Sequence, residues 1–367
     1  MADRGGRHGA HTPSSDVTGV DRWTVCRGAH IAVGALMRVT VLGAGSWGTT
    51  VAALTAGRNP TTLWARSASV ADEVDRDHTN SSYLQGFSLP DTLRATADIS
   101  EAVSTAELLI VGVPTAGFRA VLEQAKPFVH PWIPVVSLSK GFEQGSMLRM
   151  TEVIASVLPG RPAAVLTGPN LAKEILAGNA AASVVATEDL AVAEAIQEVV
   201  RRGVFRVYTS NDVIGCEVGG ALKNVIAIAA GMAEGLNVGD NTRATVIARG
   251  LAEVTRLGVA MGGEPATFAG LSGLGDLCAT CISPFSRNRS VGEALGRGRP
   301  IADVVGEMKM VAEGVKGAGT VMDLAARFGV EMPICDAVHR VVAGEATAVD
   351  AYAGLMRRRA RTEADPG

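Results

Sequence analysis

Short, fully apolar runs recur through the first half of the chain, and segments of helical pattern separate them. A short strand without polar residues is typical of a parallel sheet that is covered by helices on both faces. Strands and helices that alternate in this way indicate βαβ units. We therefore expect the chain to open with a mostly parallel, doubly wound α/β sheet. The apolar runs occupy residues 39–42, 61–65, 108–114, 133–141, 163–169 and 181–187.

After about residue 212 the strand pattern stops and a helical period replaces it. Helices are predicted over residues 219–235, 241–257 and 311–328, with further helical pattern as far as Met356. Asp240 is a suitable N-cap for the second of these helices, and Gly258 is a suitable stop. The predicted organisation is an extension (residues 1–36), an α/β domain (37–216), an all-helical domain (217–357) and a flexible tail (358–367).

The N-terminal extension differs in composition from everything that follows it. Its first twenty residues, MADRGGRHGAHTPSSDVTGV, are polar, contain many Gly, Ser and Arg residues and show no helix or strand period. The apolar stretch HIAVGAL comes too late and is too short for a secretory signal. We expect residues 1–36 to be disordered. Met37 directly precedes the first apolar run, so either the extension is dispensable or Met37 is the true start of the protein.

Charge and cysteine content exclude several classes of function. The net charge is −3 and the pI is near 6.1, which give no general attraction to nucleic acid or anionic membranes. No apolar run reaches the roughly 18 residues of a membrane helix. Five dispersed cysteines fit a reducing compartment, and Cys278 and Cys281 form a lone C-x-x-C without a second ligand pair. We expect a soluble cytoplasmic protein without a metal.

The first apolar run leads directly into GAGSWG, a complete G-x-G-x-x-G motif. Between a strand and a helix, its glycines suit a Rossmann-type dinucleotide site. Gly43 allows the tight turn, Gly45 allows backbone N–H groups to approach a pyrophosphate, and Gly48 allows close helix–strand packing. The helix N-terminus also favours phosphate. The alternative is a glycine turn with a purely structural role.

The end of the second apolar run bears on the choice of cofactor. Folds that select NAD place Asp or Glu there to accept a hydrogen bond from the ribose 2′-OH, whereas here the position holds Arg66. A guanidinium favours a 2′-phosphate through charge-assisted hydrogen bonds. NADP(H) is therefore the preferred cofactor and NAD(H) the second choice. The alternative is a surface arginine that tolerates both.

Lysine, rather than histidine, is the candidate acid in this chain. Of the six histidines, three fall in residues 1–36, and none of the others adjoins a strand end together with a carboxylate. Lys140 follows an apolar run, at the edge of the sheet where ligands bind. Lys223 lies within GGALKNVIAIAAG, where burial and a second cation would lower the pKa of a lysine toward neutrality. The alternative is a lysine that reaches solvent at the helix edge.

Two polar clusters later in the chain complete the candidate site. GLSGLGDL places Asp276 in a glycine-rich loop, where it can orient a lysine or accept from a hydroxyl. SPFSRNRS brings hydroxyl, guanidinium and amide donors together, which suits a phosphate or carboxylate. The alternative is a solvated polar loop. The donors are Ser286, Arg287, Asn288 and Arg289.

Seven segments together resemble the bacterial NAD(P)-dependent glycerol-3-phosphate dehydrogenases. They occur in the family's order between residues 37 and 355, and the segment around Lys223 is the most specific. The resemblance implies the two-domain build of the 6-phosphogluconate dehydrogenase-like enzymes. It also implies interconversion of dihydroxyacetone phosphate and sn-glycerol 3-phosphate for glycerophospholipid synthesis, and a homodimer. The segments are GAGSWGT, SLSKGFE, TGPNLAKEI, DVIGCEVGGALKNVIAIAAG, GDNTRATVIARGLAEVTRLG, GLSGLGDL and SRNRS.

The resemblance also assigns roles to individual residues. Lys223 matches the family's proton donor and acceptor, and Lys140 would contact cofactor and substrate. The other substrate-contacting positions are Gly168, Asn170, Asp276, Ser286, Arg287 and Asn288, and we count Lys140, Lys223 and Asp276 as catalytic. The cofactor-contacting positions are Gly43, Gly45, Ser46, Trp47, Gly48, Arg66, Lys140, Ala172, Arg287, Val311 and Glu313.

Some positions depart from the family's usual pattern. Asn170 replaces Ser or Thr, Leu171 replaces an aromatic residue, and SLSKG replaces Ala-Thr-Lys-Gly. Asn170 still offers a donor and an acceptor. Two rival hypotheses remain: another β-hydroxyacid or ketopantoate-type dehydrogenase, and a non-catalytic NADP(H) sensor. The donors around Arg287 favour a phosphorylated substrate, and the joint presence of Lys140, Lys223 and Asp276 favours an enzyme.

Overall fold

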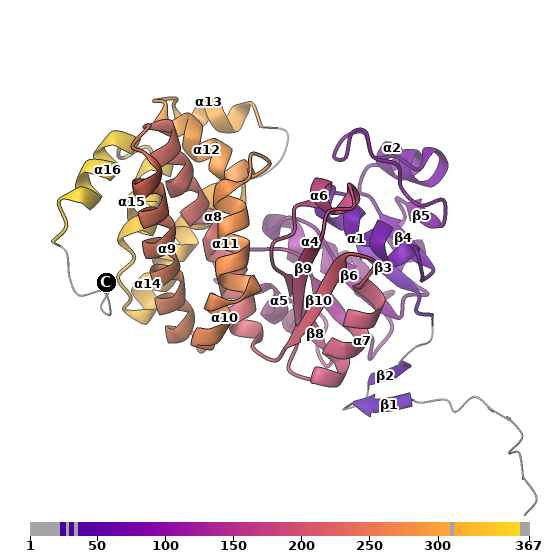
Figure 1. Ribbon diagram of the computed structural model, residues 1–367. Helices are drawn as coiled ribbons and strands as arrows, with labels where there is room; N and C mark the ends of the chain where they lie inside the picture. Colours follow the sequence, from indigo (N-terminus) through magenta and orange to yellow (C-terminus); the bar gives the residue numbers. More distant parts are fainter. Residues whose placement is uncertain (1–22, 27–28, 33–35, 309–311, 360–367) are drawn as a thin grey trace, which may run out of the picture.

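The computed structural model describes residues 23–26, 29–32, 36–308 and 312–359, which form an α/β half and an all-helical half side by side (Figure 1). The α/β half ends with a strand at Ser210, and the first helix of the second half begins at Val213. The helical half therefore starts a few residues before the predicted boundary at 217.

The α/β half contains an eight-stranded sheet in the order β10-β9-β8-β7-β6-β3-β4-β5. Strands β3 to β8 all run parallel to one another, β9 is antiparallel to β8, and β10 is parallel to β9. The expected mostly parallel sheet is confirmed, and the six apolar runs form the six strands that lie between its two edge strands. The edge strands β5 and β10 were missed because each exposes part of its length and so lacks a continuous apolar run. The strands are β3 (Val39–Leu42), β4 (Thr61–Trp64), β5 (Leu93–Thr96), β6 (Leu108–Val111), β7 (Val135–Ser137), β8 (Ala163–Thr167), β9 (Ala181–Ala186) and β10 (Phe205–Ser210).

Helices cover both faces of this sheet. On one face, Val39 and Val41 of β3 join a buried apolar cluster with α1 and α7. On the other face, Leu42 joins a second cluster with α3, α4 and α5. The alternation of side chains along a strand makes both faces available for packing. The helices are α1 (Ser46–Ala56), α2 (Ala68–Asp72) with the π-helical turn η1 (Glu73–Asp77), α3 (Ile99–Val103), α4 (Thr115–Ala125), α5 (Met150–Val157), α6 (Ala172–Leu176) and α7 (Leu190–Val200).

The helical half is built around α8, which other helices surround (Figure 1). Its small residues allow backbones to approach one another. A Cβ atom on Gly231 would lie 2.0 Å from the carbonyl oxygen of Arg289, and one on Gly292 would lie 2.0 Å from that of Ile228. The helices are α8 (Val213–Gly235), α9 (Asp240–Ala260), α10 (Pro265–Ala269), the π-helical turn η2 (Leu271–Gly275), α11 (Asp276–Ile282), α12 (Arg287–Gly296), α13 (Ile301–Gly306), α14 (Glu313–Phe328), α15 (Pro333–Val342) and α16 (Ala348–Met356).

Two details of α9 differ from the sequence-based expectation. Asp240 is the first helical residue, and Gly239, with φ of 86°, holds the N-cap position. The helix also continues through Gly258 to Ala260. Gly258 provides packing space instead of a stop, since a Cβ atom there would lie 2.0 Å from the ring of Phe268.

The N-terminal extension, for which disorder was expected, contains two short strands. Strands β1 (Trp23–Cys26) and β2 (Ala29–Ala32) pair antiparallel as a hairpin. The hairpin lies beside α7 (Figure 1). The remaining residues of the extension up to 35, and residues 360–367 of the expected tail, lie outside the described residues.

Among the described residues, one helix, α8, has the length and hydropathy of a membrane helix. Its 23 residues are long and apolar enough by composition, yet 89% of the most apolar window is buried within the protein. Burial in the core of the helical half explains its composition equally well.

Candidate active site

The glycine-rich turn between β3 and α1 has the shape of a phosphate cradle. Gly43 has φ of +114°, and a Cβ atom on it would meet the carbonyl oxygen of Gly112 at 2.8 Å. A Cβ atom on Gly48 would lie 2.0 Å from the carbonyl oxygen of Gly43, so α1 packs directly on the turn. Open space surrounds Gly45. The three glycines therefore match the requirements of turn, helix packing and ligand approach, and the turn fits a dinucleotide.

Other predicted cofactor residues surround this turn. Ser46 Oγ donates to the carbonyl oxygen of Tyr83 at 3.2 Å. The Trp47 ring contacts Phe205 edge to face at 6.1 Å, and its Nε1 is buried without a partner among the described residues. Arg66 is exposed just beyond β4, the strand next to β3. In dinucleotide-binding folds, this position faces the ribose 2′-OH or 2′-phosphate.

A second set of predicted residues follows the carboxyl ends of β7 and β8. Lys140 Nζ donates to the carbonyl oxygen of Gly168 at 2.8 Å. Asn170 Oδ1 accepts from Ser183 Oγ, whereas Asn170 Nδ2 is buried and unpaired within the described part of the chain. An unpaired buried amide is costly, so this donor is available for a ligand group. Ala172 begins α6 immediately after this segment.

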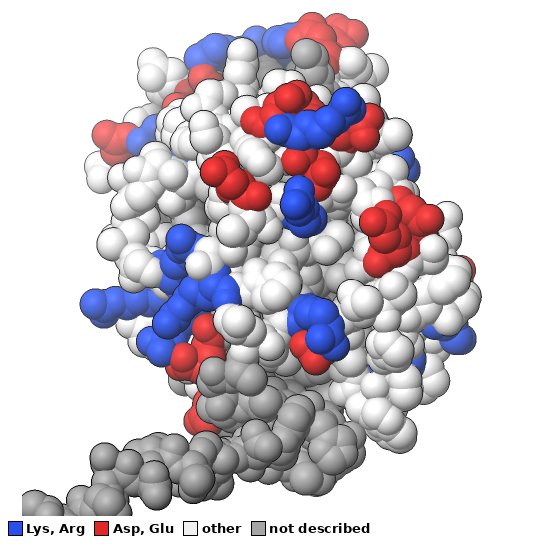
Figure 2. Space-filling model, turned by 90° about the vertical axis from the view of Figure 1, so that its right-hand side faces the viewer, with Lys and Arg blue, Asp and Glu red and all other residues white. Residues whose placement is uncertain are grey.

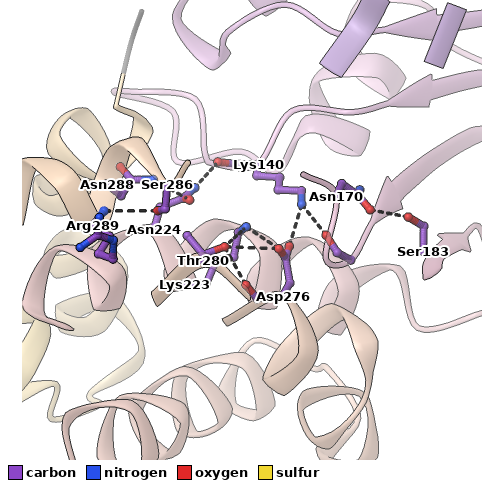
Figure 3. Close-up of polar contacts among 11 residues, drawn as sticks. Lys140, Asn170, Ser183, Lys223, Asn224, Asp276, Thr280, Ser286, Asn288 and Arg289 are labelled. Atoms are coloured by element: carbon purple, nitrogen blue, oxygen red, sulfur yellow. Dashed lines mark hydrogen bonds and ion pairs between the residues drawn. The ribbon is translucent and has the colours of Figure 1, made fainter. Parts of the chain in front are cut away.

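Lys140, Lys223 and Asp276 form one cluster between the two halves (Figure 3). Lys140 Nζ lies 2.7 Å from Asp276 Oδ2, and Lys223 Nζ lies 2.5 Å from Asp276 Oδ1. Lys223 Nζ also donates to Thr280 Oγ1 at 2.6 Å. The side chains of Lys140, Lys223 and Asp276 are only 15%, 8% and 2% exposed. We name these three residues the lysine–aspartate–lysine cluster.

Burial lowers the pKa of Lys140 to about 8. Attraction to Asp276 opposes this change, and repulsion by Lys223 adds to it. A lysine with such a pKa changes charge within a unit or so of neutral pH, which suits it to orient and polarise a carbonyl oxygen. Lys223 does not reach solvent at the helix edge but is paired inside the protein.

The predicted phosphate-binding segment starts α12. Ser286 is the N-cap, and its Oγ accepts from Arg289 N at 3.3 Å. Asn288 is buried between α8 and α14, while Arg287 is exposed. Arg289 turns inward instead, and its Nη1 lies 2.5 Å from Glu234 Oε2. The two arginines therefore differ: Arg287 is exposed, and Arg289 is buried in ion pairs with Glu234 and Glu293.

A chain of amides joins this segment to the rest of the site. Asn224 Nδ2 donates to the carbonyl oxygen of Lys140 at 3.1 Å, and Asn288 Nδ2 donates to Asn224 Oδ1 at 2.9 Å. Gly314 N donates to Asn288 Oδ1 at 3.0 Å. The neighbouring Glu313 accepts from Thr115 Oγ1 at 2.8 Å. Val311, also predicted for the cofactor, lies outside the described residues.

Helix α8 is fixed against the α/β half by a buried carboxylate. Glu217 accepts from Arg149 Nη1 at 2.7 Å and from Thr151 N at 2.9 Å. Burial raises the pKa of Glu217. These bonds hold the first turns of α8 to the start of α5, and so set the orientation from which Lys223 projects.

Sequence reasoning missed several members of this arrangement. Thr280 lies four residues after Asp276, on the same face of α11, but Asp276 had been placed in a glycine-rich loop. In the structure that loop is the turn η2, and Asp276 begins α11. Asn224 was visible beside Lys223 but received no role. Thr115 carried no sequence signal, since only folding brings it to Glu313.

The other candidate chemistry of the chain finds no support in the described residues. Cys278 and Cys281 are free thiols, and burial raises the pKa of both. The described part of the chain holds no group of three or more His, Cys, Asp or Glu residues arranged for a metal. On the face shown in Figure 2, basic and acidic side chains both occur, separated by broad neutral areas.

Two family models match the chain and together span most of it. Residues 38–193 match the N-terminal domain of NAD-dependent glycerol-3-phosphate dehydrogenase, and residues 212–353 match its C-terminal domain. The boundaries agree with the junction before α8.

Individual relatives agree with the family models. A glycerol-3-phosphate dehydrogenase (NAD(P)+) of Sphingopyxis alaskensis is 56% identical over 331 residues, which cover 90% of this chain and 99% of that protein. One of Mycobacterium tuberculosis is 53% identical over 320 residues, covering 87% and 94%.

Solved structures agree as well. The crystal structure of glycerol-3-phosphate dehydrogenase from Coxiella burnetii matches with a TM-score of 0.84 and 35% identity, over 88% of this chain and 99% of that one. A ketopantoate reductase from Ralstonia eutropha shares the fold with a TM-score of 0.55 and 17% identity, over 86% of this chain and all of that one. The paired lysines, the glycine cradle and these matches lead to one assignment: the chain belongs to the NAD-dependent glycerol-3-phosphate dehydrogenase family.

Proposed function

We propose that the chain catalyses the reversible reduction of dihydroxyacetone phosphate to sn-glycerol 3-phosphate, with NADPH as the preferred cofactor and NADH as the second choice. The observation that carries this proposal is the lysine–aspartate–lysine cluster, which lies at the strand ends of the dinucleotide fold and beside the Arg287 segment. The product supplies the glycerol backbone of phospholipids.

The cofactor would be held by the glycine turn and its surroundings. Backbone N–H groups at the start of α1 face the pyrophosphate. The exposed guanidinium of Arg66 meets the 2′-phosphate. The remaining proposed contacts come from Ser46, Trp47, Lys140, Ala172, Arg287, Val311 and Glu313, of which Val311 rests on the resemblance alone.

The substrate would bind between the strand ends and the helical half. Arg287 and Asn288 hold its phosphate, with Ser286 at the start of the same helix. Asn170 Nδ2, buried without a described partner, donates to a substrate oxygen, and Gly168 keeps Lys140 in place through its carbonyl oxygen.

The bound cofactor supplies a hydride to the ketone carbon. Lys223 Nζ donates a proton to the ketone oxygen, which becomes the new hydroxyl, and regains a proton from solvent afterwards. Lys140 orients and polarises the same oxygen. Asp276 holds both ammonium groups, and Thr280 fixes the direction of Lys223. In the reverse direction Lys223 accepts the proton.

The test is the fall in absorbance at 340 nm with dihydroxyacetone phosphate, with NADPH and NADH measured in parallel. Wild type should oxidise the cofactor, and Lys223→Ala should not, while its NADPH affinity stays close to that of wild type. Near-normal kcat in Lys223→Ala would refute the role of Lys223. A wild type that binds NADPH but oxidises it only with unphosphorylated keto acids would refute the substrate and favour a ketopantoate-type activity. No oxidation with any ketone would favour the sensor hypothesis.

We also propose a cytoplasmic homodimer that inserts in no membrane and binds no nucleic acid. The net charge of −3 supports the last point. A shallow surface along α9 supports self-association, because most of its side chains are apolar; it is lined by Ala248, Leu251, Ala252, Thr255, Arg256 and Val259. Light scattering after size exclusion should give twice the chain mass, and Ala252→Glu should shift it to the monomer. A wild-type monomer would refute the dimer.

A further inference from the structure

A continuous line of buried amides links three parts of the proposed site (Figure 3). It starts at the carbonyl oxygen of Lys140, passes through the side chains of Asn224 and Asn288, and ends at the backbone N–H of Gly314. The bonds measure 3.1, 2.9 and 3.0 Å in that order. Asn224 and Asn288 are only 7% and 8% exposed. A broken link would leave a buried polar group without a partner, so these bonds favour one joint arrangement.

Asn224 gives Lys140 a second point of attachment. The Lys140 ammonium is held by Asp276 and by the carbonyl oxygen of Gly168, and the backbone of the same residue is held by Asn224. Consecutive residues of a helix project about 100° apart. Lys223 therefore reaches α11 while Asn224 reaches the loop after β7, and one turn of α8 places both lysines.

The part of the line beyond Asn224 adjoins the proposed ligand contacts. Asn288 follows Arg287, which would hold the substrate phosphate. Gly314 follows Glu313, which would contact the cofactor and which accepts from Thr115 at the start of α4. The packing between them is tight, because a Cβ atom on Gly314 would lie 2.5 Å from the carbonyl oxygen of Asn224. A shift of the α14 end is therefore transmitted directly to α8.

We propose that Asn224 is a positioning residue that couples the substrate-phosphate segment and the cofactor segment to the placement of Lys140. This inference rests on the proposed function. A ligand at Arg287–Asn288 orders the same amides that a ligand at Glu313 orders. The second ligand then meets a site that is already arranged, and the two bind more tightly together than apart.

The coupling is measurable with a pair of ligands that cannot react with each other, NADPH and glycerol 3-phosphate. Titration of NADPH, followed by tryptophan fluorescence or calorimetry, gives its Kd without and with saturating glycerol 3-phosphate. In wild type the ratio of the two Kd values should be about 5 or more. In Asn224→Ala it should fall to about 1, with the Kd for NADPH alone within about twofold of wild type, since no direct cofactor contact is removed. Asn241→Ala, at an exposed position of α9, is the matched control and should keep the wild-type ratio.

A second variant separates coupling from folding. Asn224→Asp keeps the shape and the acceptor for Asn288 but loses the donor to Lys140, so it should also lose the coupling. It should shift the basic limb of the pH–kcat profile as well, because Lys140 loses its backbone anchor. A purely structural role would lower the melting temperature and leave the Kd ratio unchanged.

Wild-type ratios in both variants, or a ratio of about 1 in wild type, would overturn the proposal. Failure of the proposed function is a different result: wild type would then bind NADPH without oxidising it in the presence of dihydroxyacetone phosphate.

Discussion

Asp276 lies between two largely buried ammonium groups, so removing it and removing Lys223 have opposite effects on local charge. With both lysines protonated, two positive charges and one negative charge leave the lysine–aspartate–lysine cluster at +1. Asp276→Asn raises this to +2 and removes ion pairs of 2.7 and 2.5 Å. Breaking a buried pair from one side costs about 3–5 kcal/mol. Lys223→Met leaves the pair of Lys140 with Asp276 intact at zero charge, so it should cost less, about 1–2 kcal/mol.

The effects of the two substitutions on the free energy of unfolding should therefore not be additive. In the Asp276→Asn background, Lys223→Met removes an unpaired buried cation and returns the cluster to +1, so it should raise the free energy of unfolding by about 1 kcal/mol or more. In wild type the same substitution should lower it. The measurement is urea unfolding of the four proteins at pH 7, with equal m-values as the check on two-state behaviour.

The same four proteins should rank differently by kcat than by free energy of unfolding. Every variant that lacks Lys223 or Asp276 should lose about 10²–10⁴-fold in kcat, while NADPH still binds. In Asp276→Asn the pKa of Lys140 should fall below its wild-type value of about 8, because the attraction that raises it is gone. The reasoning is refuted if Lys223→Met has the same sign and size of effect on stability in both backgrounds.

Three further predictions concern the cofactor cradle and the helical core. Gly48→Ala should fold poorly, because its Cβ atom would lie 2.0 Å from the carbonyl oxygen of Gly43. Gly45→Ala lies in open space, so it should keep the wild-type melting temperature and lose NADPH affinity. Equal melting temperatures of the two variants would contradict this reading of the turn. Arg66→Asp should lower the ratio of kcat/KM with NADPH to kcat/KM with NADH by about 10–100-fold. An unchanged ratio would refute the assignment of Arg66 to the 2′-phosphate. Burial raises the pKa of Glu253 to about 7 from 4.5. Between pH 4.5 and 7 the folded state then binds more protons than the unfolded state. The contribution of Glu253 to the free energy of unfolding is therefore fully present below pH 4.5 and is lost as the pH rises through 7. Glu253→Gln should flatten that slope in denaturant unfolding across pH 5–7, and an unchanged slope would argue against it.

The local chemistry of several segments was readable from sequence. The glycine turn at residues 43–48 was predicted because its requirements are set by neighbours along the chain, a strand before it and a helix after it. The inner strands were predicted because burial on both faces imposes an uninterrupted apolar run. The unusual position of Lys223 was visible for a related reason, since a charge in an apolar helix needs a partner.

The partners themselves were not readable, because they come from distant parts of the chain. Lys140 and Asp276 are 136 residues apart, and Thr115 and Glu313 are 198 apart. No local period or spacing encodes such pairs; they follow from how α8 packs against the sheet and its neighbouring helices. The same packing turned Arg289 inward and left Arg287 outward, although both lie in one polar run.

The sequence by itself determined the two-part architecture, the glycine-rich turn and the choice of Lys140 and Lys223 as candidate residues. Each of these depends on residues that lie close together in the chain. Tertiary structure decided which carboxylate pairs with those lysines, which arginine of the polar run is exposed and which is buried, and how one line of amides joins three segments of the proposed site. Those choices depend on the approach of separate helices, which small residues such as Gly220, Gly231 and Gly314 permit without dictating.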